Sequence, residues 1–115
     1  MSATETTPSP ATEDATLRHI VDTIVEALDP AQVILFGSRA RGDDTAHSDY
    51  DICVVADTDR PYHERNMEVH RLFSRRDFSM DAFVLTPEEF EAQRQVVNTL
   101  GFYVDRDGEV LYERS

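Results

Sequence analysis

The spacing of apolar side chains changes along the first half of the chain, and this change separates a helix from the strands that follow it. Over residues 15–28 they recur every three or four positions, the period of an amphipathic helix, and Asp29-Pro30 is expected to end it. Residues 33–36 and 49–56 are short, mostly apolar runs that predict two strands. Gly37 ends the first strand, and a short helix is expected to open directly after it.

The second half of the chain continues to alternate. Residues 61–74 predict a helix and residues 78–85 a third strand. Thr86 is a predicted N-cap, followed by proline and two glutamates, and the helix that it opens is expected to run through Leu100. A turn and a short terminal strand over 109–112 complete the pattern. Strands interleaved with helices predict a layered domain of the α/β or α+β class.

The remaining composition describes one small soluble domain. Residues 1–14 are rich in Thr, Ser, Pro and Glu, which predicts a disordered tail before a single domain over 15–115. The one cysteine, Cys53, excludes an internal disulfide and is expected to be a small buried hydrophobe. The longest apolar run, residues 52–56, is too short to span a membrane, and no signal peptide is evident. We therefore expect a soluble, cytoplasmic protein.

The charge balance narrows the classes of partner. Acidic residues number 23 against 11 basic ones, which gives a formal net charge of −12, and every basic residue is arginine. Such a surface repels phosphate backbones, whereas nucleic-acid binding draws much of its affinity from Lys and Arg that displace counterions. A module that binds DNA or RNA directly is therefore disfavoured.

The second predicted strand begins with two carboxylates, Asp49 and Asp51. Because side chains alternate along a strand, both project from one face, about 7 Å apart along the strand. Cys53 and Val55 continue that face, so the carboxylates lie at the mouth of a buried strand and repel each other unless a cation lies between them. Mg²⁺ favours carboxylate and phosphate oxygens and suits this position. Taken alone, the short pattern favours a simpler interpretation, in which Ser48-Asp49 caps a turn and Asp51 lies in solvent.

A glycine and a serine upstream favour the metal site over this simpler interpretation. Gly37 lets the backbone approach a bulky anion, and the Ser38 hydroxyl and free N–H groups at the helix start can donate to a phosphate. Arg41 shares a helix face with Ser38, whereas Arg39 is expected to pair with Asp43 on the surface. Alone, Gly37-Ser38 is explained by a strand end with a helix cap. Beside two carboxylates, it supplies the parts needed to bind a metal–nucleotide complex.

A third carboxylate, Asp81, interrupts the apolar strand predicted over 78–85. An unpaired charge in the middle of a strand is costly to bury, so Asp81 needs a metal or another partner. A salt bridge to an arginine is the structural alternative. Asp77 is a weaker candidate, because it follows Arg75-Arg76 in a polar turn where exposure explains it.

These residues resemble a known signature. Gly37-Ser38, ten intervening residues and then Asp49-x-Asp51 are similar to the nucleotidyltransferase motif of the DNA polymerase β superfamily. The longer string Gly-Ser-Arg-Ala-Arg-Gly, followed by Ser-Asp-Tyr-Asp, resembles the minimal nucleotidyltransferases of that superfamily. The resemblance covers about residues 17–113 and implies one small nucleotidyltransferase domain, with a mixed β-sheet flanked by helices.

The resemblance also implies the chemistry. Family members hold two Mg²⁺ ions on three aspartates, and the matching residues here are Asp49, Asp51 and Asp81. The nucleotide phosphates would be held by Gly37 and Ser38, with Arg41 assisting. The implied reaction is in-line attack of a hydroxyl on the α-phosphorus of ATP with release of pyrophosphate, one metal activating the hydroxyl and the other neutralising the triphosphate. Asp81 can in addition accept the hydroxyl proton.

The partner is implied by the resemblance as well. Minimal nucleotidyltransferases are typically encoded beside a helical HEPN protein, and some are antitoxins that add AMP to a tyrosine of that HEPN ribonuclease. A complex of the two chains is thus expected, and the acidic surface suits a basic partner. Two alternatives stay open: a non-catalytic antitoxin that acts by binding alone, and a transferase for a small hydroxylated molecule.

Overall fold

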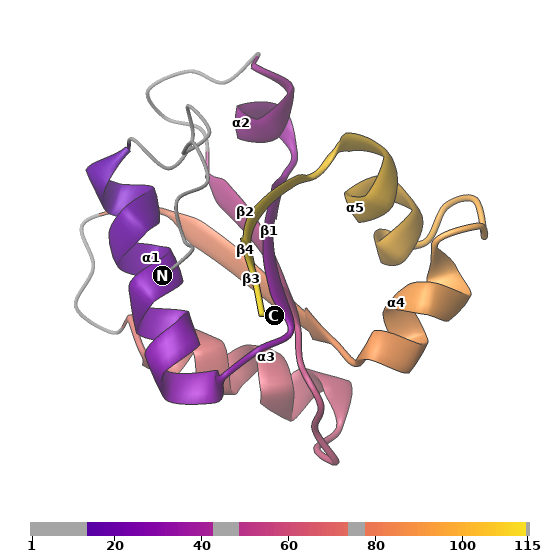
Figure 1. Ribbon diagram of the computed structural model, residues 1–115, viewed down its shortest axis with the longest axis horizontal. Coiled ribbons are helices and arrows are strands. Elements are labelled where there is room, and N and C mark those ends of the chain that lie inside the picture. Colours follow the sequence, from indigo (N-terminus) through magenta and orange to yellow (C-terminus); the bar gives the residue numbers. More distant parts are fainter. Residues whose placement is uncertain (1–13, 43–48, 74–77, 115) are drawn as a thin grey trace.

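The computed structural model describes residues 14–42, 49–73 and 78–114, and these fold into a mixed sheet with helices around it (Figure 1). The helices are α1 (Ala15–Leu28), α2 (Ser38–Arg41), α3 (Tyr62–Arg71), α4 (Pro87–Gln93) and α5 (Leu100–Asp107). The strands are β1 (Gln32–Phe36), β2 (Tyr50–Val55), β3 (Met80–Leu85) and β4 (Glu109–Glu113). This arrangement confirms the predicted α+β class. The predicted tail, apart from Asp14, and the loop over 43–48 lie outside the described residues.

The sheet has the strand order β3-β2-β1-β4. Strand β1 pairs antiparallel with β2 and with β4, whereas β2 and β3 are parallel and α3 connects them. Because parallel neighbours begin at the same edge of a sheet, the first residues of β2 and β3 lie side by side. None of the helices in the described ranges is long and apolar enough to cross a bilayer.

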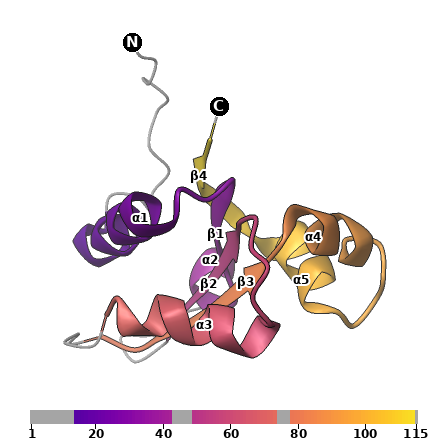
Figure 2. The same cartoon turned by 90° about the horizontal axis from the view of Figure 1, so that it is seen from below.

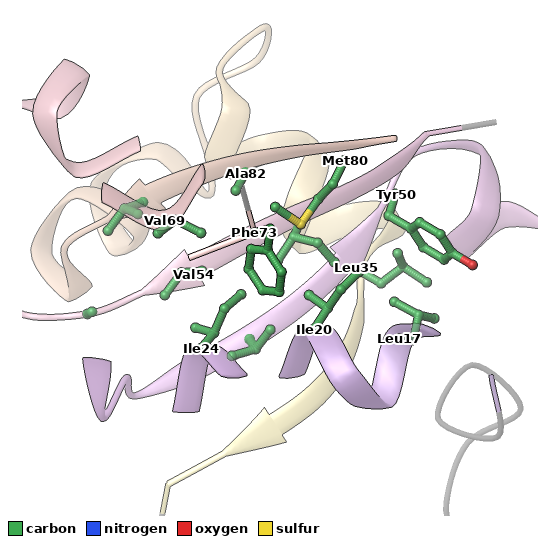
Figure 3. Packing of buried hydrophobic residues seen from close by; sticks show 14 residues of the cluster. Leu17, Ile20, Ile24, Leu35, Tyr50, Val54, Val69, Phe73, Met80 and Ala82 are labelled. Atoms are coloured by element: carbon green, nitrogen blue, oxygen red, sulfur yellow. The ribbon is translucent and has the colours of Figure 1, made fainter. Parts of the chain in front are cut away.

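Alternate side chains of the strands feed two separate clusters of buried residues. On one face, Ile52 and Val54 of β2 pack against Ile20 and Ile24 of α1 and against Val69 of α3 (Figure 3). The opposite face is covered by α4 and α5, which lie across the sheet from α1 (Figure 2). The cluster there consists of Ile34, Cys53, Val55, Leu85, Phe90 and Val104. Cys53 is the small buried hydrophobe that was predicted, and burial raises the pKa of its thiol to about 12.

The helix predicted from Thr86 begins as expected but is wrong in its length. Thr86 caps α4 in a reciprocal capping box with Glu89, and α4 then ends at Gln93. Asn98 adopts a left-handed conformation, with φ of 71°, which an α-helix cannot continue through. The Thr99 hydroxyl donates to the Gln93 carbonyl at 2.9 Å and accepts the Phe102 N–H at 3.2 Å. A turn and a second N-cap therefore divide the predicted helix into α4 and α5.

Two side chains of α3 hold that helix to the outer edge of β3. Arg65 is only 9% exposed and donates to both carboxylate oxygens of Glu89, at 2.7 and 3.2 Å, and to the Val84 carbonyl at 3.3 Å. Asn66 accepts the Val84 N–H through its Oδ1 at 2.8 Å. These hydrogen bonds connect α3 with β3 and with the start of α4.

Arg65→Met is expected to destabilise the fold by about 2 kcal/mol, less than the roughly 3–5 kcal/mol of a fully buried pair, because Glu89 is partly solvated. The Arg65 hydrogen bond lowers the pKa of the Glu89 carboxyl. The pair therefore stabilises the fold above the pKa of an unfolded glutamate, and this stability is lost as the pH falls through the lower folded value. Urea unfolding at neutral and acid pH measures both effects.

Arg60→Met is the matched control for this prediction. The Arg60 side chain lies 3.9 Å from Glu68, and both side chains are more than 40% exposed. Such a surface pair contributes about 0–1 kcal/mol. Equal losses of stability in the two variants would contradict the role given to Arg65.

Candidate active site

The two central carboxylates of the predicted site lie next to each other in the sheet. Asp51 of β2 and Asp81 of β3 are register partners in the parallel pair, so both project from the face that α4 and α5 cover farther along. Burial decreases toward the start of each strand: in β2 Cys53 is fully buried and Asp51 half-buried, and in β3 Phe83 is half-buried and Asp81 exposed. Asp49 directly precedes β2 and is exposed. The carboxylates thus lie at the open end of this face.

The three carboxylates interact electrostatically. The pKa of Asp51 is raised above its ordinary value, first by burial and then by the negative charges of Asp81 and Asp49. The positive charge of Arg41 acts in the opposite direction. Asp51 is therefore the charge in this group that is hardest to hold without a cation. Arg41, at the end of α2, supplies part of that positive charge.

The bend after β1 fits closely against Asp51. Gly37 has φ of 80° and ψ of −158°, a combination that L side chains rarely adopt. A Cβ atom at this position would collide with Oδ2 of Asp51. Phe36, the preceding residue, is the register partner of Asp51 across β1 and β2. Gly37 is thus needed both for its backbone conformation and for the space that the carboxylate occupies, and Ser38 opens α2 directly beside it.

One expectation about neighbouring residues needs correction, and the pairing of Arg39 with Asp43 stays a prediction. Asp81 was expected in mid-strand, where burial would be costly, but β3 begins at Met80, so Asp81 is its second residue and is exposed. Within the described ranges, no arginine forms an ion pair with it. Arg39 lies over the ring of Tyr50, with its Cζ 3.9 Å from the ring centroid. Its expected partner Asp43 lies outside the described residues, as does the candidate Asp77.

A divalent metal with oxygen preference fits this group of residues. In the part of the chain that the structure describes, no three His, Cys, Asp or Glu side chains are arranged to hold a metal ion by themselves. Mg²⁺, however, is usually bound by one or two carboxylates together with waters and substrate phosphates. Asp51 and Asp81 are adjacent oxygen donors whose charges repel, with Asp49 nearby. This donor set suits Mg²⁺ that arrives with a phosphorylated ligand.

One contact beside the site was missed by the sequence analysis. The Tyr50 hydroxyl donates to Oδ2 of Asp14 at 2.9 Å, although Asp14 was assigned to the tail and Tyr50 was given no role. Asp14 is in fact the N-cap of α1. An aspartate directly before the first apolar residue of a helix is a capping signal, and it could have moved the predicted domain boundary by one residue.

Known proteins share a family model and a fold with this chain. The family model described as "Nucleotidyltransferase domain" matches residues 16–105. A crystal structure described as that of a "putative nucleotidyltransferase" from Sulfolobus solfataricus is similar, with a TM-score of 0.62 and 21% sequence identity. The similarity covers 97% of this chain and 94% of the other, and it shows a shared fold. No protein of curated function matches the chain.

Proposed function

This chain belongs to the nucleotidyltransferase domain family, and we propose that it transfers AMP from ATP to a hydroxyl group in a reaction that depends on Mg²⁺. The observation that carries the proposal is the pairing of Asp51 with Asp81 in register beside the Gly37 bend. It brings acidic oxygens from two strands to the place where a backbone bend can receive a phosphate.

The carboxylates of Asp49, Asp51 and Asp81 are the groups proposed to hold the metal. When bound, Mg²⁺ supplies Lewis-acid activation of the attacking hydroxyl and neutralises the negative charge of the triphosphate. The pKa of Asp51 is raised first by burial and then by the negative charges of Asp81 and Asp49, and a bound cation would offset that repulsion.

The other residues of the site act on the nucleotide and on the proton. The Gly37 bend permits close approach of the backbone to a phosphate, and the Ser38 hydroxyl can donate to it. Arg41 adds a positive charge on the same short helix. In the reaction, the acceptor oxygen forms a new bond to the α-phosphorus while the bond to pyrophosphate breaks. The exposed carboxylate of Asp81 can take the proton that the hydroxyl loses.

The acceptor that we propose is a tyrosine of a HEPN ribonuclease, which would make this chain the antitoxin of a toxin–antitoxin pair. The resemblance of the Gly-Ser and Ser-Asp-Tyr-Asp strings to minimal nucleotidyltransferases supports this proposal. The net charge of −12 supports it too, because an acidic surface is attracted to the positive RNA-binding surface that a ribonuclease requires.

Incubation with labelled ATP, Mg²⁺ and the HEPN-type protein encoded by a neighbouring gene tests the proposal. The expected result is a mass gain of one AMP on a tyrosine of the partner. No such gain is expected when EDTA is present from the start of the incubation. Modification of an aminoglycoside in place of the partner would instead identify a small-molecule transferase. Neutralisation of the toxin that survives Asp49→Asn, without any mass gain, would contradict catalysis and indicate an antitoxin that acts by binding.

A further inference from the structure

Tyr50 lies between Asp49 and Asp51 in the chain, but its side chain enters the opposite face of the sheet. It is 7% exposed, packs in the cluster that contains Leu17, and lies at the Leu17 end of α1 (Figure 3). Its hydroxyl donates to Oδ2 of Asp14 at 2.9 Å. Oδ1 of Asp14 accepts the Thr16 N–H at 2.8 Å. One carboxylate therefore caps α1 and anchors the first residue of β2.

The ring and the backbone of Tyr50 connect two further elements. The guanidinium of Arg39, in α2, lies 3.9 Å from the ring centroid, within the range of a cation–π contact. The Tyr50 N–H donates to the Ser79 carbonyl at 2.9 Å, just before β3. The start of α1, the helix after the Gly37 bend, the start of β2 and the segment leading into β3 therefore all meet at this residue.

We propose that Tyr50 is a positioning residue for nucleotide transfer. Its hydrogen bond to Asp14 and its contact with Arg39 fix the start of β2 relative to α2. This inference rests on the proposed function. Because Asp49 and Asp51 are the chain neighbours of Tyr50, any displacement of Tyr50 displaces their backbone. Because Arg39 belongs to the four-residue helix that begins at Ser38, the same contact holds the phosphate-binding bend beside the carboxylates. Sites of this kind tolerate displacements of only about 0.5 Å.

Two variants remove the hydrogen bond in different ways. Tyr50→Phe keeps the ring, its packing and the Arg39 contact, and loses only the hydroxyl. Asp14→Ser keeps an N-cap oxygen for α1, but its single oxygen cannot also serve Tyr50. Asp14→Asn can still cap the helix and hydrogen-bond the hydroxyl, so it is the conservative variant. Thr99→Ala, which loses the N-cap of α5, controls for a general loss of stability.

We expect Tyr50→Phe and Asp14→Ser to lower kcat about tenfold while KM for ATP changes less than about twofold, because geometry is lost and not substrate contact. Affinity for Mn²⁺ alone, measured by titration calorimetry, is expected to fall about tenfold, as for other losses of groups that orient metal ligands. Asp14→Asn should keep most of the wild-type kcat and most of the wild-type affinity for Mn²⁺. Thr99→Ala should change neither.

The outcomes separate this inference from the function on which it rests. If the wild type transfers AMP and Tyr50→Phe behaves like Thr99→Ala in kcat and in Mn²⁺ affinity, the positioning role is wrong. If the wild type transfers no nucleotide but Mn²⁺ affinity still falls in Tyr50→Phe and returns in Asp14→Asn, the proposed function fails, whereas Tyr50 still positions the metal-binding carboxylates.

Discussion

Asp51→Asn is expected to abolish nucleotide transfer and, at the same time, to stabilise the folded protein at neutral pH. The amide keeps the shape of the side chain but removes the central negative charge of the carboxylate group, so we expect transfer to fall by at least about a thousandfold. The gain in stability follows because burial and two neighbouring carboxylates disfavour the ionised form of Asp51. Transfer assays and thermal unfolding at pH 7 measure the two effects.

The raised pKa of Asp51 determines how its contribution to the stability of the fold changes with pH. The folded pKa of Asp51 is raised above its ordinary value of 3.8, so over the interval between these two pKa values the folded state binds more protons than the unfolded state. The contribution of Asp51 is therefore most favourable below this interval and decreases as the pH rises through it. Asp51→Asn should remove that contribution from a pH titration of the melting temperature.

Asp22→Asn is the matched control, because it makes the same change in net charge on an exposed position of α1. It should leave transfer unchanged and give a smaller change in melting temperature. A destabilised Asp51→Asn at pH 7 would show that this carboxylate makes compensating contacts in the fold, and substantial residual transfer would remove it from the metal-binding group.

Gly37→Ala is expected to have the second largest effect, on both activity and stability. The backbone of Gly37 combines a positive φ with an extended ψ, a conformation almost confined to glycine, and a residue with a side chain pays about 1–3 kcal/mol to adopt it. The new methyl group would also meet Oδ2 of Asp51, so either the bend or the carboxylate must move. Since the bend and the carboxylate are the two parts that the reaction needs together, we expect transfer to fall at least about a hundredfold.

Gly42→Ala is the comparison variant. Gly42 also has a positive φ, 85°, but its ψ of 9° places it in the left-handed helical region, and among the described residues a Cβ atom there meets nothing within 4 Å. It should lose stability through the backbone term alone and keep most of the activity. The difference between the two variants in kcat measures the effect of the contact with Asp51, whereas the difference in urea unfolding also contains the larger backbone cost at Gly37. If Gly37→Ala lowered stability and kcat no more than Gly42→Ala does, the close approach of Gly37 to Asp51 would not be needed for function.

The sequence predicted those features that depend on contiguous residues. Apolar runs located the strands, and alternation along β2 placed Asp51 on one face with Cys53 and Val55. The division between α4 and α5 was missed, because Val96, Val97 and Leu100 continue a helical spacing while the turn depends on the conformation of a single residue, Asn98. Helical periodicity does not report such local interruptions.

Features that depend on pairing between distant segments were harder to predict from the sequence. The register that sets Asp51 beside Asp81 joins residues on two strands separated by α3, and only the resemblance to a family suggested it. Arg65 shares a helix face with the buried Val69, four residues later, and this is the one local sign of its partly buried ion pair with Glu89. The hydrogen bond from Tyr50 to Asp14 has no local sign beyond the capping position of Asp14.

The hydrogen bonds from α3 to Val84 also affect how this protein behaves in a crowded solution. The outer strand of an open sheet offers unpaired backbone groups on which strands of other molecules can assemble into aggregates. At Val84 both the N–H and the carbonyl of β3 are taken by Asn66 and Arg65. A foreign strand that adds to this edge would have to displace both side chains, so α3 protects the chain against intermolecular strand pairing there.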